Sequence, residues 1–287
     1  MNFFLFFITT VLLVPAPAAA QQQKPVAPAA PPKLTRTTIT NETRRLGYGG
    51  TVTIVGAPDG SITVEGWNRS DVEVRAETQM HADSEKDLDQ LAAVNGVILD
   101  EDLNHVRIMT TGMHDRAYMK KVAKNFPKQL LNLPWRVDYR IRVPIACDLD
   151  INGGRGPITV TNVDGNIRIS SPQSQVTLLL GGGTLSTTIA AGQVALKVSE
   201  KSWRHGSVEI AVAAGDIELQ LPGGFNGDLD ADVLRTGEIV NSLENVAARE
   251  KPGITKQQVR ARIGTGGSSM RLSVGDGRIA IKKSTDP

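Results

Sequence analysis

The amino-acid sequence predicts an all-β protein in which short strands repeat in a regular way. Runs of alternating apolar and polar residues follow one another through most of the chain, and glycine recurs just before these runs. In the segment GPITVTNVDGNIRIS, residues 156–170, two glycines lie nine residues apart and each opens such a run. Alternation turns one face of a strand inward, and a unit this short cannot bury that face unless it stacks on similar units.

The glycines mark the expected corners between strands. Glycine adopts positive φ at a tight turn without steric cost. Each corner is followed at the second and usually the fourth residue by an aliphatic side chain, as Gly215 is by Ile217 and Leu219. The structural turns predicted in this way are Gly156, Gly165, Gly192, Gly206, Gly215, Gly237 and Gly277.

Two architectures fit this pattern: a β-solenoid-like stack of short strands with glycine corners, and an antiparallel β-sandwich. Coils of a solenoid would lie about 4.8 Å apart. The solenoid is favoured because the long runs lack the two-residue Asn-Gly loops that are typical of a hairpin meander. The low aromatic content, 4%, agrees with a narrow interior filled by Val, Ile and Leu.

The N-terminus predicts export. Residues 1–20, MNFFLFFITTVLLVPAPAAA, have the apolar core and small residues of a signal peptide, with cleavage expected between Ala20 and Gln21. A membrane anchor is the competing interpretation, but the apolar run ends at Val14 and is too short to cross a bilayer of about 30 Å. Residues 21–35 are rich in Pro, Ala and Gln and predict a disordered tether.

Two further regions are expected to form one continuous domain. Residues 36–147 contain the first strands, with Val52, Val72 and Val106 among their inward positions, and a helix near 84–95. Ser84 or Asp83 is the expected N-cap of that helix. Residues 148–287 form the β-repeat region.

Residues 112–135 interrupt the strand pattern with a basic insertion. Lys120, Lys121 and Lys124 lie beside Tyr118, Val122 and Phe126, which would share one face of a helix. The insertion could therefore be a basic amphipathic helix that contacts an anionic surface. The alternative is a loop with one helical turn that covers the edge of a sheet.

Composition excludes some classes of protein. The chain has 32 basic and 30 acidic side chains, without the basic excess of a nucleic-acid-binding protein. The only cysteine, Cys147, has no partner for a disulfide within the chain and is expected to be a small buried residue. No cofactor is expected, and no integral membrane segment remains once the signal peptide is removed.

Three sets of residues are candidates for binding or chemistry. Asp228, Asp230 and Asp232 alternate and would share a strand face that suits Ca²⁺, although exposed strand positions explain them equally well. Asp148 and Asp150 could act as a general acid/base pair, but they fit an ordinary exposed pattern.

The tryptophans are the third set. Trp67 and Trp203 could stack on sugars, with Trp203 and the lysines of the insertion as possible surface contacts, or they could cap the core, which is favoured.

The strand pattern resembles the putative-adhesin family of β-strand-repeat proteins, a bacterial envelope domain of unknown function. The pieces that carry the resemblance, between residues 49 and 282, are SITVEGWNRSDVEV, VDYRIRVPIACDLDI, GPITVTNVDGNIRI, AGDIELQLPGGFNGDLDADV, SWRHGSVEI and RLSVGDGRIAIK. The resemblance implies a stacked β fold and an exported location, and it implies no catalytic residues. The chain departs from the family pattern in the basic insertion and at residues 241–262, where the sequence suggests a helix.

Together these observations predict an exported, non-enzymatic β-repeat protein that acts as a binding, adhesin-like or structural module of the bacterial cell envelope, in the periplasm or on the outer surface. An envelope glycan or protein is the expected kind of partner. One alternative is a periplasmic scaffold that self-assembles or docks a membrane partner. Another is a glycan-processing enzyme on a β-solenoid, which would need a carboxylate cluster in a groove.

Overall fold

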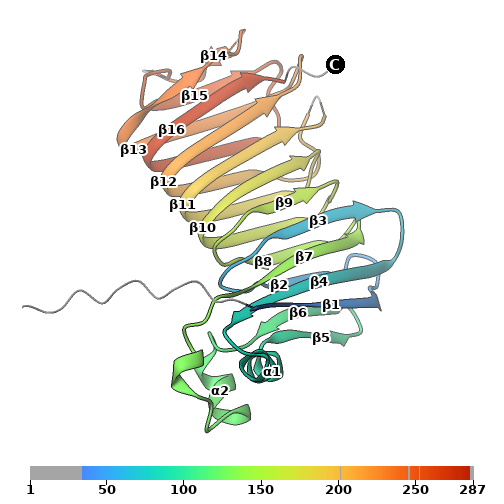
Figure 1. Cartoon of the computed structure of the whole chain (residues 1–287). Coiled ribbons are helices and arrows are strands. Elements are labelled where there is room, and N and C mark those ends of the chain that lie inside the picture. The colour runs from blue at the N-terminus through green and yellow to red at the C-terminus, as the bar shows by residue number, and fades with distance from the viewer. Residues whose placement is uncertain (1–33, 201, 245, 252, 285–287) are drawn as a thin grey trace, which may run out of the picture. The chain divides into compact units, whose positions relative to one another are not determined.

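The computed structural model describes residues 34–284 apart from 201, 245 and 252 (Figure 1). The described residues belong to one compact unit. The predicted signal peptide, its cleavage site at Ala20 and Gln21, and all but the end of the tether lie outside the described residues. Among the described residues, no helix has the length and apolar character needed to cross a bilayer.

The described part of the chain is mainly β and contains two α-helices and one 3₁₀ turn. The helices are α1 (Glu85–Val94) and α2 (Arg116–Val122), and the turn is η1 (Lys128–Leu130). The strands, in chain order, are β1 (Leu34–Arg45), β2 (Thr51–Val55), β3 (Ile62–Trp67), β4 (Asp71–Ala82), β5 (Gly96–Asp102), β6 (His105–Thr111), β7 (Trp135–Pro144), β8 (Asp148–Asn152), β9 (Ile158–Thr161), β10 (Asn166–Leu180), β11 (Thr184–Val198), β12 (Val208–Leu221), β13 (Gly227–Asn241), β14 (Val246–Ala248), β15 (Gln258–Ile263) and β16 (Ser269–Lys283).

These strands form one large mixed sheet. Its main path has twelve strands in the order β1-β4-β7-β3-β9-β10-β11-β12-β16-β13-β15-β14, and β2, β5, β6 and β8 branch from it. Along that path pairing is parallel from β7 to β13 and antiparallel at the two ends. The path is open, so the all-β prediction holds at the level of a mainly β mixed sheet, while the solenoid stays a prediction.

The register of the parallel pairs explains the repeat in the sequence. The first part of β10 pairs with β8 and the last part with β9, so the two arms of this strand belong to different ladders. Ile167 pairs with Leu185, and on the other arm Ile158 pairs with Val176; in both pairs the partner lies eighteen residues later. One full repeat of the stack is therefore eighteen residues long here. It contains two apolar runs, one on each arm of the strand, and this explains why glycines recur every nine residues.

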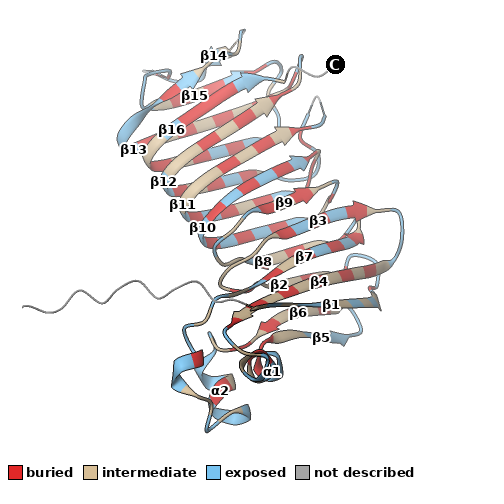
Figure 2. Cartoon of the chain, viewed as in Figure 1, coloured by how far each residue is buried: buried red, intermediate tan, exposed pale blue. Residues whose placement is uncertain are grey.

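Buried residues alternate with more exposed ones along the strands (Figure 2), and the inward aliphatic side chains form rows from strand to strand. One such row joins Ile151, Ile169, Thr187, Ile210 and Leu272. All five are buried, and their burial alternates with exposure along each strand as the sequence predicts. Because each strand contributes one residue to the row, the core extends continuously along the parallel stack.

Helix α1 confirms the helix predicted near residues 84–95. Ser84 is its N-cap, and its side chain accepts a hydrogen bond from the backbone N–H of Asp87. Leu88 and Leu91 are buried against β4. Arg36 of β1 donates to carboxylates of Glu85 and Asp89 at 2.7 Å, which ties the helix to the first strand.

Of the two structures considered for residues 112–135, the basic amphipathic helix is wrong. Helix α2 has seven residues and ends at Val122, whose side chain is 53% exposed; Met119 is the residue it buries. Phe126 lies beyond the helix and packs on the cluster around Leu88. The side chain of Asp115 caps the start, but the chain leaves helical geometry at Ala123, so no continuous apolar face forms. The insertion is the alternative expected: a loop with short helical turns.

The helix suggested for residues 241–262 is also wrong. This region contains β14 and β15, and β15 pairs antiparallel with β13. Val259, Ala261 and Ile263 are buried at alternate positions, which is the period of a strand. Pro252 and Gly253 interrupt the sequence before β15 and are unfavourable inside a helix.

Candidate functional site

Six of the seven predicted corner glycines have positive φ, from 129° to 146°, and Gly165 does not. A Cβ at Gly165 would nevertheless lie 2.1 Å from the carbonyl oxygen of Cys147. Glycine is required there by the close approach of two backbones rather than by its φ angle.

The predicted acidic cluster lies on one face of β13 and is paired with arginines. Asp228 accepts from Arg262 Nε at 2.9 Å, and Asp232 accepts from Arg260 Nη2 at 2.8 Å. Asp230 is ion-paired with Arg249. The bond from Arg262 is the main cause that lowers the pKa of Asp228. Among the described residues, no group of three or more His, Cys, Asp or Glu side chains is placed to hold a metal ion.

Asp148 and Asp150 also lie where a strand pattern places them, on the outward face of β8. Asp148 Oδ1 accepts from the backbone N–H of Asn166 at 2.8 Å, and Oδ2 accepts from its side-chain amide at 3.1 Å. Asp148 therefore has a structural partner at the start of β10.

For Trp203 the sequence offers two interpretations, a surface contact and the favoured one, a cap on the core, and the structure contradicts the surface contact. The side chain is 3% exposed, belongs to the core cluster, and donates from Nε1 to the carbonyl oxygen of Gly183 at 2.6 Å. Trp203 is therefore part of the core, in agreement with the favoured interpretation that it packs on the core. Trp67 is half-buried, and the guanidinium carbon of Arg69 lies 4.8 Å from its ring centroid.

The lysines of the insertion, Lys120, Lys121 and Lys124, are all exposed. They lie on and just after α2 and line neither of the two cavities described next. These lysines therefore belong to neither of the two candidate binding cavities.

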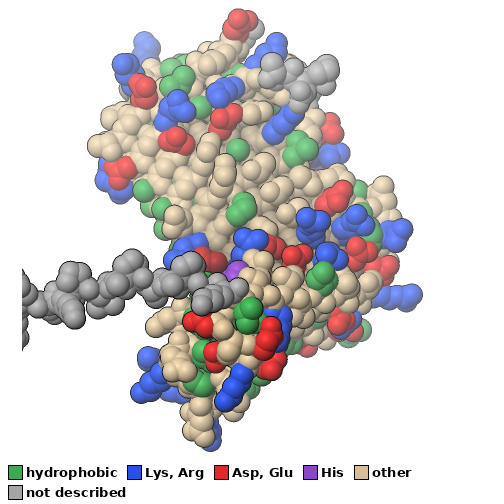
Figure 3. Space-filling model, in the orientation of Figure 1, with side chains coloured by type: hydrophobic (Ala, Val, Ile, Leu, Met, Phe, Trp, Pro, Cys, Tyr) green, Lys and Arg blue, Asp and Glu red, His purple; other side chains and the backbone are tan. Residues whose placement is uncertain are grey.

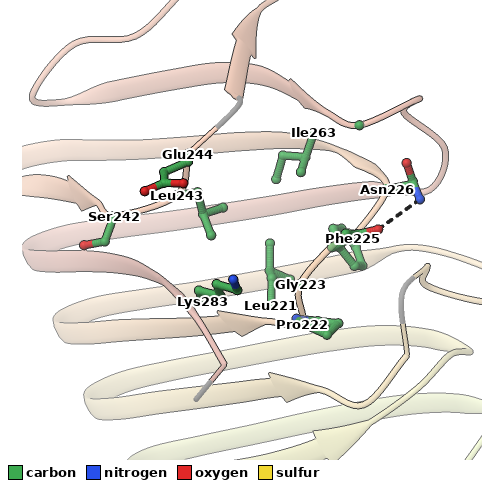
Figure 4. Close-up of a pocket in the computed structure, with 12 residues that line it drawn as sticks. Leu221, Pro222, Gly223, Phe225, Asn226, Ser242, Leu243, Glu244, Ile263 and Lys283 are labelled. Carbon is green, nitrogen blue, oxygen red and sulfur yellow. Dashed lines mark hydrogen bonds between the residues drawn. The ribbon is translucent and has the colours of Figure 1, made fainter. Parts of the chain in front are cut away.

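One cavity, of ≈370 Å³, opens at the C-terminal end of the core (Figure 4). Leu221, Phe225, Leu243 and Ile263 point into a common space, and Lys283 and Glu244 also line it. Leu221, Phe225 and Ile263 belong to the main apolar core. The cavity is therefore the open end of that core and can accommodate a small apolar group.

A second cavity, of ≈350 Å³, lies on the outward face of β3, β4 and β7. Acidic and basic side chains gather over these strands in Figure 3, whereas the visible face over β9–β12 is mostly uncharged. The residues that line the cavity are Ser61, Thr63, Arg75, Glu77, Arg136, Asp138 and Arg140.

Two pairs of like charges lie directly opposite each other in this cavity. Arg75 of β4 pairs with Arg140 of β7, and Glu77 pairs with Asp138. Like charges at directly opposed positions destabilise an antiparallel pair. The site therefore has an electrostatic cost in the free protein.

Most charges in the cavity have partners, but Arg140 has none among the described residues. Asp138 accepts from Ser61 Oγ at 2.7 Å and is 3.0 Å from Arg136 Nη2. Arg75 Nη2 is 3.8 Å from Glu77 Oε2. Across the described residues, Arg140 makes no ion pair and no side-chain hydrogen bond, and it is exposed.

Sequence reasoning did not identify this site. The segment RVDYRIRV shows charged residues at alternate positions, which indicates an outward strand face. The alignment of Arg140 with Arg75 depends on the register between β4 and β7, and those strands are separated by a helix, two strands and the basic insertion. No local signal in the sequence gives that register.

Comparison with known proteins gives low-identity structural neighbours. No family model matches the chain, and no curated protein matches it. A putative cell adhesion protein from Clostridium sporogenes is 12% identical and covers 86% of this chain and 100% of its own, with a TM-score of 0.44. A putative adhesin from Bacteroides fragilis, also 12% identical, covers 86% and 97%, with a TM-score of 0.32. A putative adhesin from Parabacteroides distasonis is 6% identical, covers 86% and 97%, and has a TM-score of 0.27.

These three structural neighbours are described as putative adhesins or as a putative cell adhesion protein, the class that the sequence resembles.

Proposed function

We propose that this chain is an exported, non-enzymatic binding module of the bacterial cell envelope, adhesin-like in its role. Its working surface is the outward face of β4, β7, β3, β9, β10 and β11. The observation that carries the proposal is the cavity on this face, where Arg140 has no partner among the described residues and lies opposite Arg75. A charged group that the fold leaves uncompensated is available to a ligand.

The support for this surface is rigid. Each of these strands pairs with a neighbour on both sides, and the inward side chains beneath the face, such as Val64, Val160 and Leu178, are buried. Because the backbone of these strands is already ordered, ligand binding costs free energy mainly for ordering exposed side chains such as Arg140. In this proposal the parallel strands stack as a solenoid-like rod that presents the face to its partner.

Export is supported by residues 1–20, which have the composition of a signal peptide. The proposed location is the periplasm or the outer surface of a bacterium. Protease treatment of intact cells, compared with cells whose outer membrane has been opened, tests this. Digestion in intact cells supports the outer surface, and protection until opening supports the periplasm. Recovery in the cytoplasm with residues 1–20 still attached would contradict export.

A second candidate function is a periplasmic scaffold that docks a membrane partner or another copy of the chain. The cavity at the C-terminal end favours it, because apolar side chains of the core reach the surface there. A glycan-processing enzyme is less well supported, since the carboxylates of Asp228, Asp230 and Asp232 are occupied by arginines.

Binding itself is tested with the full chain, purified after export and labelled with a fluorophore, on isolated envelope fractions. We expect saturable binding to cell-wall or outer-membrane polysaccharide material that unlabelled protein displaces. Failure to bind any envelope fraction would overturn the proposed function. A dimer or larger assembly by light scattering, together with no envelope binding, would favour the scaffold instead.

A further inference from the structure

We infer that the outward face of the sheet binds an anionic polysaccharide and holds one of its carboxylate or sulfate groups between Arg75 and Arg140. This inference rests on the proposed function and names its ligand class. Three observations support it. They are the charges in the cavity on β3, β4 and β7, the rows of hydroxyl and amide side chains next to that cavity, and the pairing of each strand on both sides.

The charge arrangement favours an anion at one position. Arg75 and Arg140 are directly opposite, and the only ion pair of Arg75 within the described chain spans 3.8 Å. An anion between the two guanidinium groups would replace their repulsion by two attractions. Guanidinium groups bind carboxylate and sulfate-like oxygens through two parallel N–H donors, which makes such a site geometrically selective.

Neighbouring arginines are less available than this pair. Arg136 is 3.0 Å from a carboxylate oxygen of Asp138. The guanidinium carbon of Arg142 lies 5.7 Å from the ring centroid of Trp67, and its nitrogens lie 3.6 Å from Glu73 and 3.7 Å from Glu65. The anion site is therefore confined to one place on the face.

Hydroxyl side chains continue from the arginine pair across the sheet. Arg140 pairs with Thr63, which pairs with Thr159, which in turn pairs with Thr177. Neighbouring strands are about 4.8 Å apart, so this threonine row extends on the order of 14 Å from Arg140. The adjacent row carries the amides of Gln175 and Gln193. Hydroxyl and amide groups bind the hydroxyls of a sugar chain that lies across the strands.

The backbone of the same region argues against a peptide ligand. A peptide commonly binds a sheet by adding a strand to a free edge. β4, β7, β3, β9, β10 and β11 are each hydrogen-bonded on both sides, so they present no free edge. The face offers only side chains. These are the guanidinium groups of Arg75 and Arg140, the hydroxyl and amide groups beside them, and two carboxylates, Glu77 and Asp138, that are ion-paired with Arg75 and Arg136. Such a set matches a charged glycan.

The test measures affinity of the full chain for three immobilised glycans: polygalacturonate, dextran sulfate and uncharged dextran. We expect binding to at least one of the two anionic glycans, weakening with added salt, and no binding to dextran. The stronger of the two anionic probes distinguishes a carboxylate ligand from a sulfate ligand. Equal binding to dextran would overturn the inference.

Substitutions distinguish binding at this site from nonspecific electrostatic binding of a polyanion. Arg140→Gln should weaken binding about tenfold, the loss expected for one charge-assisted hydrogen-bonded contact. Arg140→Lys keeps the charge but loses the two-donor geometry, and it should recover only part of the affinity. Arg168→Gln is the matched control, because Arg168 is exposed on the other arm of β10 and its loss changes the net charge equally.

Each outcome has a distinct meaning. Equal losses for Arg140→Gln and Arg168→Gln, or none for Arg140→Gln, overturn the inference. Wild-type binding to envelope fractions without binding to either anionic glycan also overturns it, but leaves the proposed function standing. Absence of binding to both glycans and envelope fractions overturns the two together. Near-native circular dichroism of each variant shows that a loss of binding is not a loss of fold.

Discussion

Gly192 and Gly215 occupy the same corner on two neighbouring strands, and a Cβ on Gly215 would lie 1.7 Å from the carbonyl oxygen of Gly192. The two residues pair directly in the parallel ladder of β11 and β12, and their φ angles are 135° and 138°. Glycine is therefore required at this corner for two reasons. The positive φ angle disfavours other residues, and the close approach of the neighbouring strand leaves no room for a Cβ. Such corners allow two adjacent strands to turn together without separating.

Gly215→Ala should therefore destabilise the protein by more than about 2 kcal/mol, since it combines backbone strain with a clash against main-chain atoms. Gly96→Ala is the matched control: the Cβ would meet no atom within 4 Å, and the residue does not have positive φ. Urea unfolding of both variants measures the difference. A loss for Gly215→Ala no larger than that for Gly96→Ala would contradict the corner geometry.

Thr187 is a polar interruption of an otherwise aliphatic row. It lies between Ile169 and Ile210, is 1% exposed, and its hydroxyl has no hydrogen-bond partner among the described residues. Thr187→Val keeps the shape and removes the unsatisfied group, so we expect an increase of about 1 kcal/mol in the free energy of unfolding. Thr188→Val, at the exposed neighbouring position, should change it little. Destabilisation by Thr187→Val would indicate that the hydroxyl has a partner in solution.

Cys147 is predicted to be inert in the folded protein. The side chain is 1% exposed, and burial raises the pKa of its thiol to about 12, with the charge of Asp148 adding to the effect. The thiolate is the reactive species, so a thiol reagent at pH 8 should modify the native protein very slowly. The same reagent should react fully in denaturant. Rapid modification of the native protein would show that this part of the core opens.

The positions of strands could be predicted from the sequence wherever a strand showed alternating apolar and polar residues. The alternating runs around Val52, Ile62 and Val106 became buried strands, and Ser84 marked the start of a helix correctly. Partners of those strands could not be predicted, because register depends on segments far apart in the chain.

The same limit explains the errors near the candidate site and in the insertions. The helix suggested for residues 241–262 failed because β15 takes its structure from pairing with β13. The apolar helix face considered for residues 112–135 does not form, because the helix ends at Val122 and Phe126 packs on the cluster around Leu88. Arg75 and Arg140 came together only through the pairing of β4 with β7.

His114 gives a prediction about acid stability. Its ring lies 5.5 Å from the ring of Trp135, and partial desolvation of this exposed residue lowers its pKa from the ordinary value, although the charge of Asp115 opposes the shift. The unfolded chain then binds a proton near pH 6.5 more readily than the folded chain does, so the free energy of unfolding falls as pH drops through that value. The fall in Tm between pH 7.5 and 5.5 should be smaller in His114→Gln than in the wild type. The other histidines are common to both proteins, and equal falls would contradict the shift.

The arginine pair on the outward face makes a prediction about stability that is independent of any ligand. Because Arg75 and Arg140 are opposed like charges, Arg140→Gln should raise the Tm of the free protein, by about 1–2 °C. Salt screens the repulsion between exposed charges, so added NaCl should narrow the difference between this variant and the wild type. Arg168→Gln, which removes a charge on the other arm of β10, should show no such gain.

We therefore expect Arg140→Gln to bind the anionic glycan less well and to melt at a higher temperature. That combination would show that Arg140 contributes to binding and destabilises the free fold. A lower Tm for Arg140→Gln would mean that this arginine has a stabilising partner in solution, and the anion site would then need another cation.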